Sequence, residues 1–159
     1  MSVKTPKYTV ADSWIPGAAS GLFASQPIAH EEVVCEYFGK HYPTAEAIKL
    51  VDKSYLMRLG EQIYVDSREQ MDCMARYIND CRNPLCYNVR FDKDPVNGIA
   101  RIVAIRDIVP GEELFVDYGK WYWLKLNPSR LTFMDVQKYK QSAGSALPAG
   151  EVAGAAPDI

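Results

Sequence analysis

Two short polar motifs in the second half of the chain carry residue types that could bind or act on a small ligand. The first covers residues 76–80, Arg-Tyr-Ile-Asn-Asp, and the second covers residues 111–119, Gly-Glu-Glu-Leu-Phe-Val-Asp-Tyr-Gly. The amide, carboxylate and phenol groups of Asn79, Asp80 and Tyr118 can donate or accept hydrogen bonds to a polar ligand. Each motif alone is also an ordinary structural feature, because Asn often ends a helix and Pro-Gly-Glu often forms a turn. The occurrence of both motifs together and in order is stronger evidence for a functional site than either motif alone.

Short β-rich runs surround both motifs and would have to position them. Aromatic and β-branched residues gather in runs that Gly, Pro, Asn and Asp separate, which is typical of strands in small sheets rather than of a doubly wound layer. The runs cover residues 8–10, 21–24, 33–38, 63–65, 87–91, 100–105 and 114–116. Residues 92–98 are polar and turn-rich, and they predict a long hairpin loop between two strands. This hairpin would separate Asn79 from Tyr118.

A few stretches have helical character. Residues 44–53 begin with Thr44, a candidate N-cap, and residues 67–78 have apolar side chains at helical spacing. The second helix would end next to Asn79. Residues 130–139 are a candidate for a last short helix.

Composition excludes several classes of function. The chain has 159 residues, 48% apolar and 24% charged, which fits one domain with its own core. Its formal net charge of −2 offers no basic field for a nucleic acid, so no direct nucleic-acid partner is expected. The four cysteines form no CxxC pair, so neither a metal site nor a disulfide framework is expected, and a reducing compartment fits. No apolar run approaches the roughly 18 residues of a membrane helix, so no membrane partner is expected.

Further segments join the two motifs when the chain is followed in order. They are residues 21–24, 33–39, 55–56, 65–66, 76–79, Pro84, 101–108 and 111–119. This series resembles the successive blocks of the SET-domain protein-lysine methyltransferases. The resemblance implies a β-rich fold, mainly β with short helices, in which small sheets surround a C-terminal threaded (pseudoknot) segment. No cysteine follows Cys86, so the chain resembles the compact form without zinc-binding cysteines after the SET domain.

The same resemblance implies the domain boundaries. We expect an N-terminal extension over residues 1–13, a SET domain over 14–123 and a C-terminal flanking segment over 124–141. Residues 142–159 are rich in Gly, Ala, Pro and Ser, which predicts a disordered tail because such a segment buries too little apolar surface to become ordered.

The resemblance also implies an activity and a set of site residues. The activity is methyl transfer from S-adenosyl-L-methionine to a lysine side chain, with cofactor and substrate entering a narrow channel from opposite faces. By position, Tyr118 is the catalytic tyrosine and Tyr37 is its partner across the channel. The implied cofactor-binding residues are Ser20, Gly21, Leu22, Phe23, Tyr55, Arg76, Asn79, Asp80, Tyr118 and Trp123. The implied substrate-channel residues are Tyr37, Tyr87 and Val116.

The chain departs from the family pattern at several positions. Asp80 stands where the motif usually has His, and its charge must be solvated or paired if it is buried. Ala19 stands where the first glycine of the cofactor loop normally lies, which is harmless at a negative φ and costly at a positive one. Cys81 stands where Ser or Cys is common, and Leu85 stands where a second Asn is usual. Val116 replaces an aromatic residue, and its smaller side chain predicts methylation beyond the monomethyl product.

The expected partner is a basic protein or peptide, with a histone tail favoured. The mildly acidic surface is compatible with this substrate, and the candidate groove residues are Glu31, Glu32, Glu36, Asp52 and Glu61. A histone substrate would imply the nucleus, with the cytoplasm as the other option; oligomeric state is left open. Three alternatives stay open: a degenerate SET module that binds a peptide or scaffolds a complex without catalysis, a methyltransferase for a non-histone protein, and a plain β-rich interaction domain.

Overall fold

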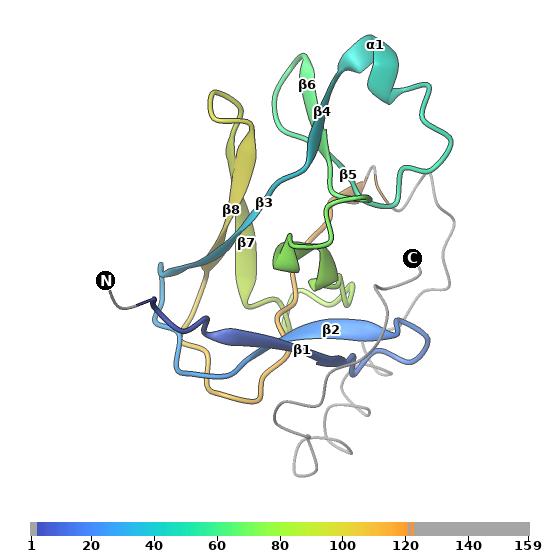
Figure 1. The fold of residues 1–159 in the computed structure, drawn as a ribbon. Helices are drawn as coiled ribbons and strands as arrows, with labels where there is room; N and C mark the ends of the chain where they lie inside the picture. Colours follow the sequence, from blue (N-terminus) through green and yellow to red (C-terminus); the bar gives the residue numbers. More distant parts are fainter. Residues whose placement is uncertain (1–2, 121, 123–159) are drawn as a thin grey trace.

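The computed structural model of the protein describes residues 3–120 and 122. Small antiparallel sheets dominate it, with one short α-helix and one 3₁₀ turn (Figure 1). In chain order the elements are β1 (Tyr8–Asp12), β2 (Ser20–Ala24), β3 (Val33–Tyr37), β4 (Lys40–Pro43), α1 (Thr44–Ala47), β5 (Leu56–Arg58), β6 (Ile63–Asp66), η1 (Met74–Tyr77), β7 (Val89–Asp94) and β8 (Ile99–Ala104). The predicted β-rich class is therefore confirmed.

The strands form three sheets that surround η1. Strands β1 and β2 pair as a two-stranded ribbon, and the other sheets have the orders β3-β8-β7 and β4-β6-β5. Figure 1 shows the ribbon below η1 and the two three-stranded sheets above and beside it. Because β5 and β7 are edge strands of different sheets, side chains from both can reach a space between the sheets.

The β7–β8 hairpin is tighter than the sequence predicted. The register runs from Val89 opposite Ala104 to Asp94 opposite Ile99, so the strands include residues that we expected in the loop. Asp94 closes the turn by accepting hydrogen bonds from the Asn97 backbone (3.1 Å) and from Arg101 (2.8 Å). The prediction of a loop over residues 92–98 was wrong because paired carboxylate and amide groups stabilise a short turn here.

Both predicted helices in the described chain are shorter than expected. The first ends at Ala47, and its N-cap is Pro43 rather than Thr44, whose hydroxyl donates to the Glu61 carbonyl instead (3.2 Å). The second is only the 3₁₀ turn Met74–Tyr77. In the segment before it the hydrogen bonds join residues three apart, as from the Gln70 amide to the Ser67 carbonyl, so no α-helix forms.

Other sequence expectations also need correction. Strands β4 and β5 were not predicted, and residues 114–116 are not a strand, since only Phe115 among them forms an isolated bridge, with Asn79. The predicted helix at residues 130–139 and the tail at 142–159 lie outside the described residues. None of the described helices is long and apolar enough to cross a membrane.

The core consists of a main cluster and a smaller aromatic one. The main cluster includes Leu22, Ile28, Val65, Ile78, Ile102, Ile108, Leu114 and Val116. In the smaller one, the Trp14 ring lies 5.7 Å from Phe23 and 6.1 Å from Phe115, measured between ring centroids. Cys35, Cys73, Cys81 and Cys86 are all free thiols, and no metal-binding cluster occurs among residues 3–120 and 122.

The segment at residues 113–118 passes between parts of the chain that are distant in sequence. On one side the Leu114 amide donates to the Leu22 carbonyl (2.8 Å), and on the other the Val116 amide donates to the Asn79 carbonyl (3.1 Å). The Asn88 side chain holds the same segment, since it accepts from the Phe115 amide at 2.8 Å. This passage brings the two polar motifs of the sequence together.

Candidate active site

A pocket of about 380 Å³ opens between β5, η1, β7 and the segment that ends at Tyr118. Its aromatic lining comes from Tyr37, Tyr55, Tyr64, Phe91, Tyr118 and Tyr122. Its charged lining is Lys53, Arg58, Arg76 and Lys93, and no Asp or Glu is among the lining residues that the structure describes. The pocket is therefore aromatic and cationic.

Tyr118 is held from two directions. Its hydroxyl donates a short hydrogen bond to the Ile78 carbonyl, and its backbone amide donates to Asp80 Oδ2 at 3.0 Å. Its ring meets the Tyr122 ring edge to face, with centroids 4.7 Å apart. Burial, together with the neighbouring Tyr122 and Asp80, raises the pKa of Tyr118 well above its usual value of 10.0. The phenol stays protonated, so it can donate a hydrogen bond but cannot act as a phenolate base.

Tyr37, which we expected opposite Tyr118, lines the same pocket. Its hydroxyl donates a short hydrogen bond to the Tyr55 carbonyl, and its ring packs edge to face on Phe91 at 6.3 Å. Burial raises the pKa of Tyr37 well above 10.0 as well. Each of the two tyrosines therefore has a neutral hydroxyl fixed on a backbone carbonyl at the pocket wall.

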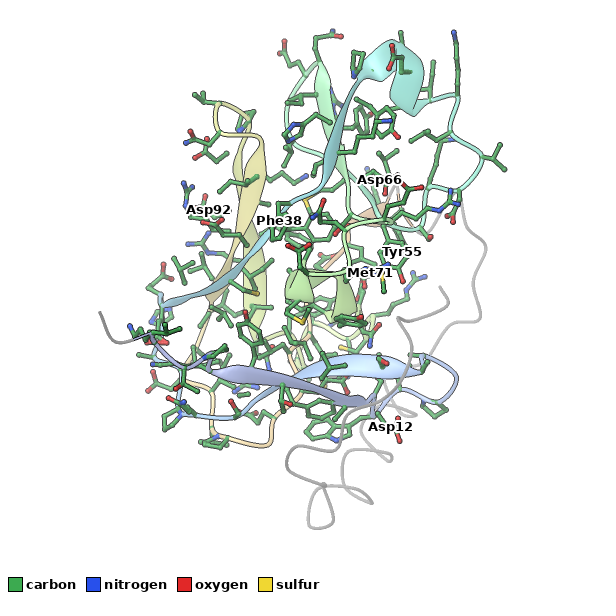
Figure 2. All side chains as sticks on the ribbon, in the orientation of Figure 1. Asp12, Phe38, Tyr55, Asp66, Met71 and Asp92 are labelled. Atoms are coloured by element: carbon green, nitrogen blue, oxygen red, sulfur yellow. The ribbon has the colours of Figure 1, made fainter. Side chains whose placement is uncertain are left out.

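Arg76 and Tyr55 form the floor of the pocket near η1. The Arg76 guanidinium lies 4.6 Å from the centroid of the Tyr55 ring, and Nη2 donates to the Arg68 carbonyl at 2.9 Å. Nη1 contacts the sulfur of Met71, which is labelled with Tyr55 in Figure 2. Arg76 is 5% exposed, and its Nε has no acceptor within the described chain. This buried cation is held by aromatic and carbonyl groups rather than by a carboxylate.

Asn79 is buried beside the pocket and does not line it. Its Nδ2 donates to the Ser20 carbonyl at 2.9 Å and lies 3.3 Å from Glu113 Oε1. Its Oδ1 is buried and has no donor among residues 3–120 and 122. A buried amide oxygen without a donor costs free energy, so Asn79 offers an acceptor that a ligand could satisfy.

The predicted cofactor loop is part of strand β2 and is fully buried. Leu22 belongs to the main core and Phe23 to the aromatic cluster, and neither they nor Ser20 and Gly21 line the pocket. Gly21 has a clear structural role, because a Cβ there would lie 2.2 Å from Glu113 Oε1. The close approach that this glycine permits is that of a carboxylate in the protein itself.

Glu113 is an important residue that sequence reasoning missed. It is 1% exposed, and its carboxylate accepts hydrogen bonds from the Ser13 hydroxyl and the Trp14 amide, both at 2.7 Å. It therefore ties the chain before β2 to the threaded segment. Its neighbour Glu112 is on the surface with Arg106, so the sequence alone offered no signal to tell the two glutamates apart.

The buried Asp80 carboxylate accepts hydrogen bonds on both of its oxygens. Oδ1 accepts from the Tyr87 hydroxyl (2.6 Å) and the Arg82 amide (2.7 Å), while Oδ2 accepts from the Tyr118 amide. Tyr87 therefore supports Asp80 and does not line the pocket. The substitution of Asp for the family's His has become a link between the two motifs.

The other departures from the family pattern have different consequences. Ala19 has a φ of +56°, the costly alternative of the two that we considered. Leu85 is 73% exposed, so the loss of the usual Asn leaves an apolar side chain in solvent. Val116 is 1% exposed in the core and does not line the pocket, so its small size does not by itself enlarge the described pocket.

The segment after Tyr118 contributes one described residue to the pocket. Tyr122, which was not in our predicted site, lines the pocket and donates a hydrogen bond to the Ser54 carbonyl at 3.2 Å. The run of aromatic residues at 121–123 was the available signal. Trp123, predicted to pack on the cofactor, lies outside the described residues.

Comparison with known proteins identifies this arrangement. The chain matches the SET domain family over residues 19–119. It is 37% identical over 108 residues to the histone-lysine N-methyltransferase, H3 lysine-4 specific, of Eremothecium gossypii, covering 62% of this chain and 11% of that protein. It is 32% identical over 122 residues to N-lysine methyltransferase KMT5A-A of Danio rerio, covering 67% of this chain and 34% of that protein.

Solved structures agree with the sequence matches. An apo form of ctPRC2 with two mutations in Ezh2 superposes with a TM-score of 0.55 at 28% identity, over 70% of this chain and 15% of that chain. A humanized mutant of the Chaetomium thermophilum Polycomb Repressive Complex 2 bound to the inhibitor GSK126 gives a TM-score of 0.57 at 27% identity, with the same coverage of 70% and 15%. The chain spans about a tenth of the H3 lysine-4 relative and a third of KMT5A-A. It belongs to the SET-domain protein-lysine methyltransferase family.

Proposed function

We propose that the protein transfers methyl groups from S-adenosylmethionine to a lysine side chain of a protein, with a histone tail as the first substrate class. The observation that carries the proposal is the pair Tyr37 and Tyr118 in one aromatic pocket of a SET-family chain. The names of the relatives support a lysine acceptor, and the histone-specific ones support the histone tail and, through it, the nucleus.

The pocket helps to deprotonate the nucleophile. A free lysine has a pKa of about 10.4, so at neutral pH its ammonium has no lone pair for attack. In this pocket a substrate ammonium would meet desolvating aromatic rings and the charges of Lys53, Arg58, Arg76 and Lys93, with no carboxylate among the lining residues that the structure describes. Both effects disfavour the charged form, and they lower the pKa of the substrate amine without a dedicated base.

The two tyrosines orient the amine after it has lost its proton. The Tyr118 and Tyr37 hydroxyls are each fixed on a carbonyl, that of Ile78 and that of Tyr55. A carbonyl oxygen has two lone pairs, so each of these carbonyls can also accept a hydrogen bond from the substrate N–H groups. Holding the amine between fixed acceptors reduces the entropy that the reaction must otherwise overcome.

The described residues fit the cofactor that the family implies. The buried Asn79 Oδ1 is an acceptor for a donor group, and Arg76 supplies a buried cation at the pocket for a carboxylate. We propose that the cofactor is held by the side chains of Asn79, Arg76 and Tyr55, by the ring of Tyr118 and by the backbone of Asp80. When bound, S-adenosylmethionine supplies a methyl group on a positively charged sulfonium.

Calorimetry with S-adenosylmethionine and methylation of histone peptides test the proposal. We expect binding that Asn79→Ala weakens and that Tyr118→Phe retains. Tyr118→Phe should lower kcat by about 10²-fold, because the ring loses the hydrogen bond that orients it. Mass spectrometry would give the products and show whether methylation goes beyond the monomethyl species. Absence of cofactor binding, both alone and with a basic peptide present, would refute the enzyme and favour the degenerate module.

A second substrate class is favoured by a specific observation. None of Glu31, Glu32, Glu36, Asp52 and Glu61, which we expected in a groove for a basic peptide, lines the pocket. Its charged lining is cationic instead, so a non-histone lysine with a less basic sequence around it would meet less repulsion. Parallel assays on purified histones and on total protein from a lysate separate the two classes.

A further inference from the structure

Three of the pocket's cations form what we call the cationic rim, namely Lys53, Arg58 and Lys93. Lys93 is exposed on the edge strand β7, and Arg58 is exposed on the edge strand β5 of another sheet. Arg58 and Lys93 both line the pocket. Desolvation, and after it the charge of Arg58, lowers the pKa of Lys93. Two strands from separate sheets thus direct positive charge toward one pocket.

The rim's charges have no carboxylate partner within the described chain. Lys53 Nζ donates to the Leu50 carbonyl at 2.7 Å, and Arg58 Nε donates to the Gly60 carbonyl at 2.9 Å. Lys93 has no ion pair within residues 3–120 and 122. Several cations elsewhere have a carboxylate partner, as Arg101 has Asp94 at 2.8 Å. The rim is distinctive because three cations without such a partner line the same pocket.

The acidic residues next to the rim's cations in sequence are Asp52, Asp92 and Asp94. Asp92 and Asp94 do not line the pocket, and Asp94 accepts a hydrogen bond from Arg101. Asp52 Oδ1 accepts from the Ser54 hydroxyl at 2.6 Å, and its Oδ2 lies 3.6 Å from the Arg68 guanidinium. It does not line the pocket. No carboxylate among the lining residues that the structure describes neutralises the rim, so a bound ligand could do so.

We propose that the cationic rim binds a carboxylate of the substrate, so that the enzyme prefers a lysine with Asp or Glu close by in sequence. This inference rests on the proposed lysine methylation and narrows its substrate class. A pocket of about 380 Å³ is on the order of 7 Å across, or about two extended residues at roughly 3.3–3.6 Å each. The acidic residue is therefore expected within about two positions of the target lysine.

The test uses three peptides with the same target lysine. The position next to that lysine is Asp in the first peptide, Asn in the second and Lys in the third. Methylation is followed by mass spectrometry, and binding is followed by fluorescence polarisation with S-adenosylmethionine present. The Asp peptide should exceed the Asn peptide by about tenfold in kcat/KM and in affinity, since several cations face one carboxylate. The advantage should shrink at about 0.5 M salt, because exposed charges are screened.

Charge reversal supplies the decisive variant. In Arg58→Glu/Lys93→Glu the preference should change from the Asp peptide to the Lys peptide. The matched control is Lys4→Glu/Lys40→Glu, which changes the net charge equally at exposed positions that do not line the pocket. The control should keep the Asp preference of the unaltered protein.

The remaining outcomes separate the sources of the carboxylate and the two proposals. If the reversal weakens S-adenosylmethionine binding without peptide and leaves the peptide preference unchanged, the carboxylate belongs to the cofactor and the inference is overturned. Methylation without an Asp preference overturns the inference and leaves the proposed function intact. If no peptide is methylated but the Asp peptide binds better and the reversal removes this difference, the rim is supported and the proposed function fails.

Discussion

The replacement of Asp80 by Asn tests whether this carboxylate positions Tyr118. Asp80 is 6% exposed, and its Oδ2 accepts from the Tyr118 amide at 3.0 Å while Oδ1 accepts from Tyr87 and Arg82. An Asn side chain whose oxygen occupies the Oδ1 position keeps the hydrogen bonds from Tyr87 and Arg82. Its Nδ2 would then face the Tyr118 N–H, so that two donors oppose each other. The perturbation is therefore concentrated on the Tyr118 backbone.

The expected magnitude follows from this one contact. A hydrogen bond to a charged group contributes about 1.5–3 kcal/mol, so the free energy of unfolding should fall by roughly 2–3 kcal/mol. The larger effect is on turnover, because a misplacement of about 1 Å can reduce the rate by about 10²-fold. We expect kcat to fall about 10–100-fold, with an affinity for S-adenosylmethionine within about threefold of the unaltered protein.

The assay measures kcat, KM, cofactor affinity and the urea midpoint of the same preparations. The matched control is Asp117→Asn, because Asp117 is exposed next to Tyr118 and accepts a backbone hydrogen bond from Gly119 at 2.8 Å rather than from Tyr118. The control should keep kcat within about twofold. A folded Asp80→Asn protein with an equally small change in kcat would refute the positioning role, whatever its loss of stability.

The other predictions concern strain, packing and thiol reactivity. Ala19→Gly should raise the free energy of unfolding by about 0.5–1 kcal/mol, because Ala at a φ of +56° is strained; an unchanged or lower urea midpoint would contradict this. Gly21→Ala should lower it by about 2 kcal/mol or more, since the new Cβ would lie 2.2 Å from Glu113 Oε1, and a midpoint equal to that of the unaltered protein would be the contrary result. Burial raises the pKa of Cys35 and Cys81 to about 12, so at about pH 8 iodoacetamide should alkylate them roughly 10³-fold more slowly than in urea, with the rate rising as the pH approaches 12. Rapid labelling of the folded protein would show that the thiols are not buried.

The strands that could be predicted are those with strong local patterns. Val33–Tyr37 and Ile99–Ala104 are rich in β-branched residues, so their strand character is visible before any pairing is known. Strand β4 has the sequence Lys-His-Tyr-Pro, which lacks such a pattern. It is a strand because β6 lies beside it and pairs from Lys40 opposite Asp66 to Pro43 opposite Ile63. Strands that depend on a partner cannot be recognised from their own residues.

The prediction of a helix over residues 67–78 was wrong because local hydrogen bonds compete with the α-helix. Its apolar spacing is real, since Ala75 and Ile78 are buried, but Met71 is 61% exposed. The Asp66 carboxylate accepts from the Arg68 amide at 2.9 Å, and tight turns follow up to Cys73. Side-chain hydrogen bonds to nearby backbone groups compete with an α-helix, and here they prevailed.

The candidate site was predictable where it follows the motifs and not where it depends on packing. Tyr37, Tyr55, Arg76 and Tyr118 came from the family pattern, and all four line one pocket. The cationic rim combines edge strands of two different sheets, so no motif contains it. Its charge also contradicts the inference from the net charge of −2, because an average over the whole surface does not describe one pocket.

The motif residues divide into those that face the pocket and those that hold it together, and the two groups predict different mutant behaviour. Tyr37 and Tyr118 present neutral hydroxyls at the pocket wall, so their loss should change turnover more than stability. Glu113 and Gly21 meet behind the pocket in the contact between β2 and the threaded segment, so their loss should mainly lower stability. Asp80 belongs to both groups, because it is buried and also bonded to the Tyr118 backbone. A substitution of Asp80 should therefore lower both turnover and stability, whereas a substitution in either group alone should mainly lower one of them.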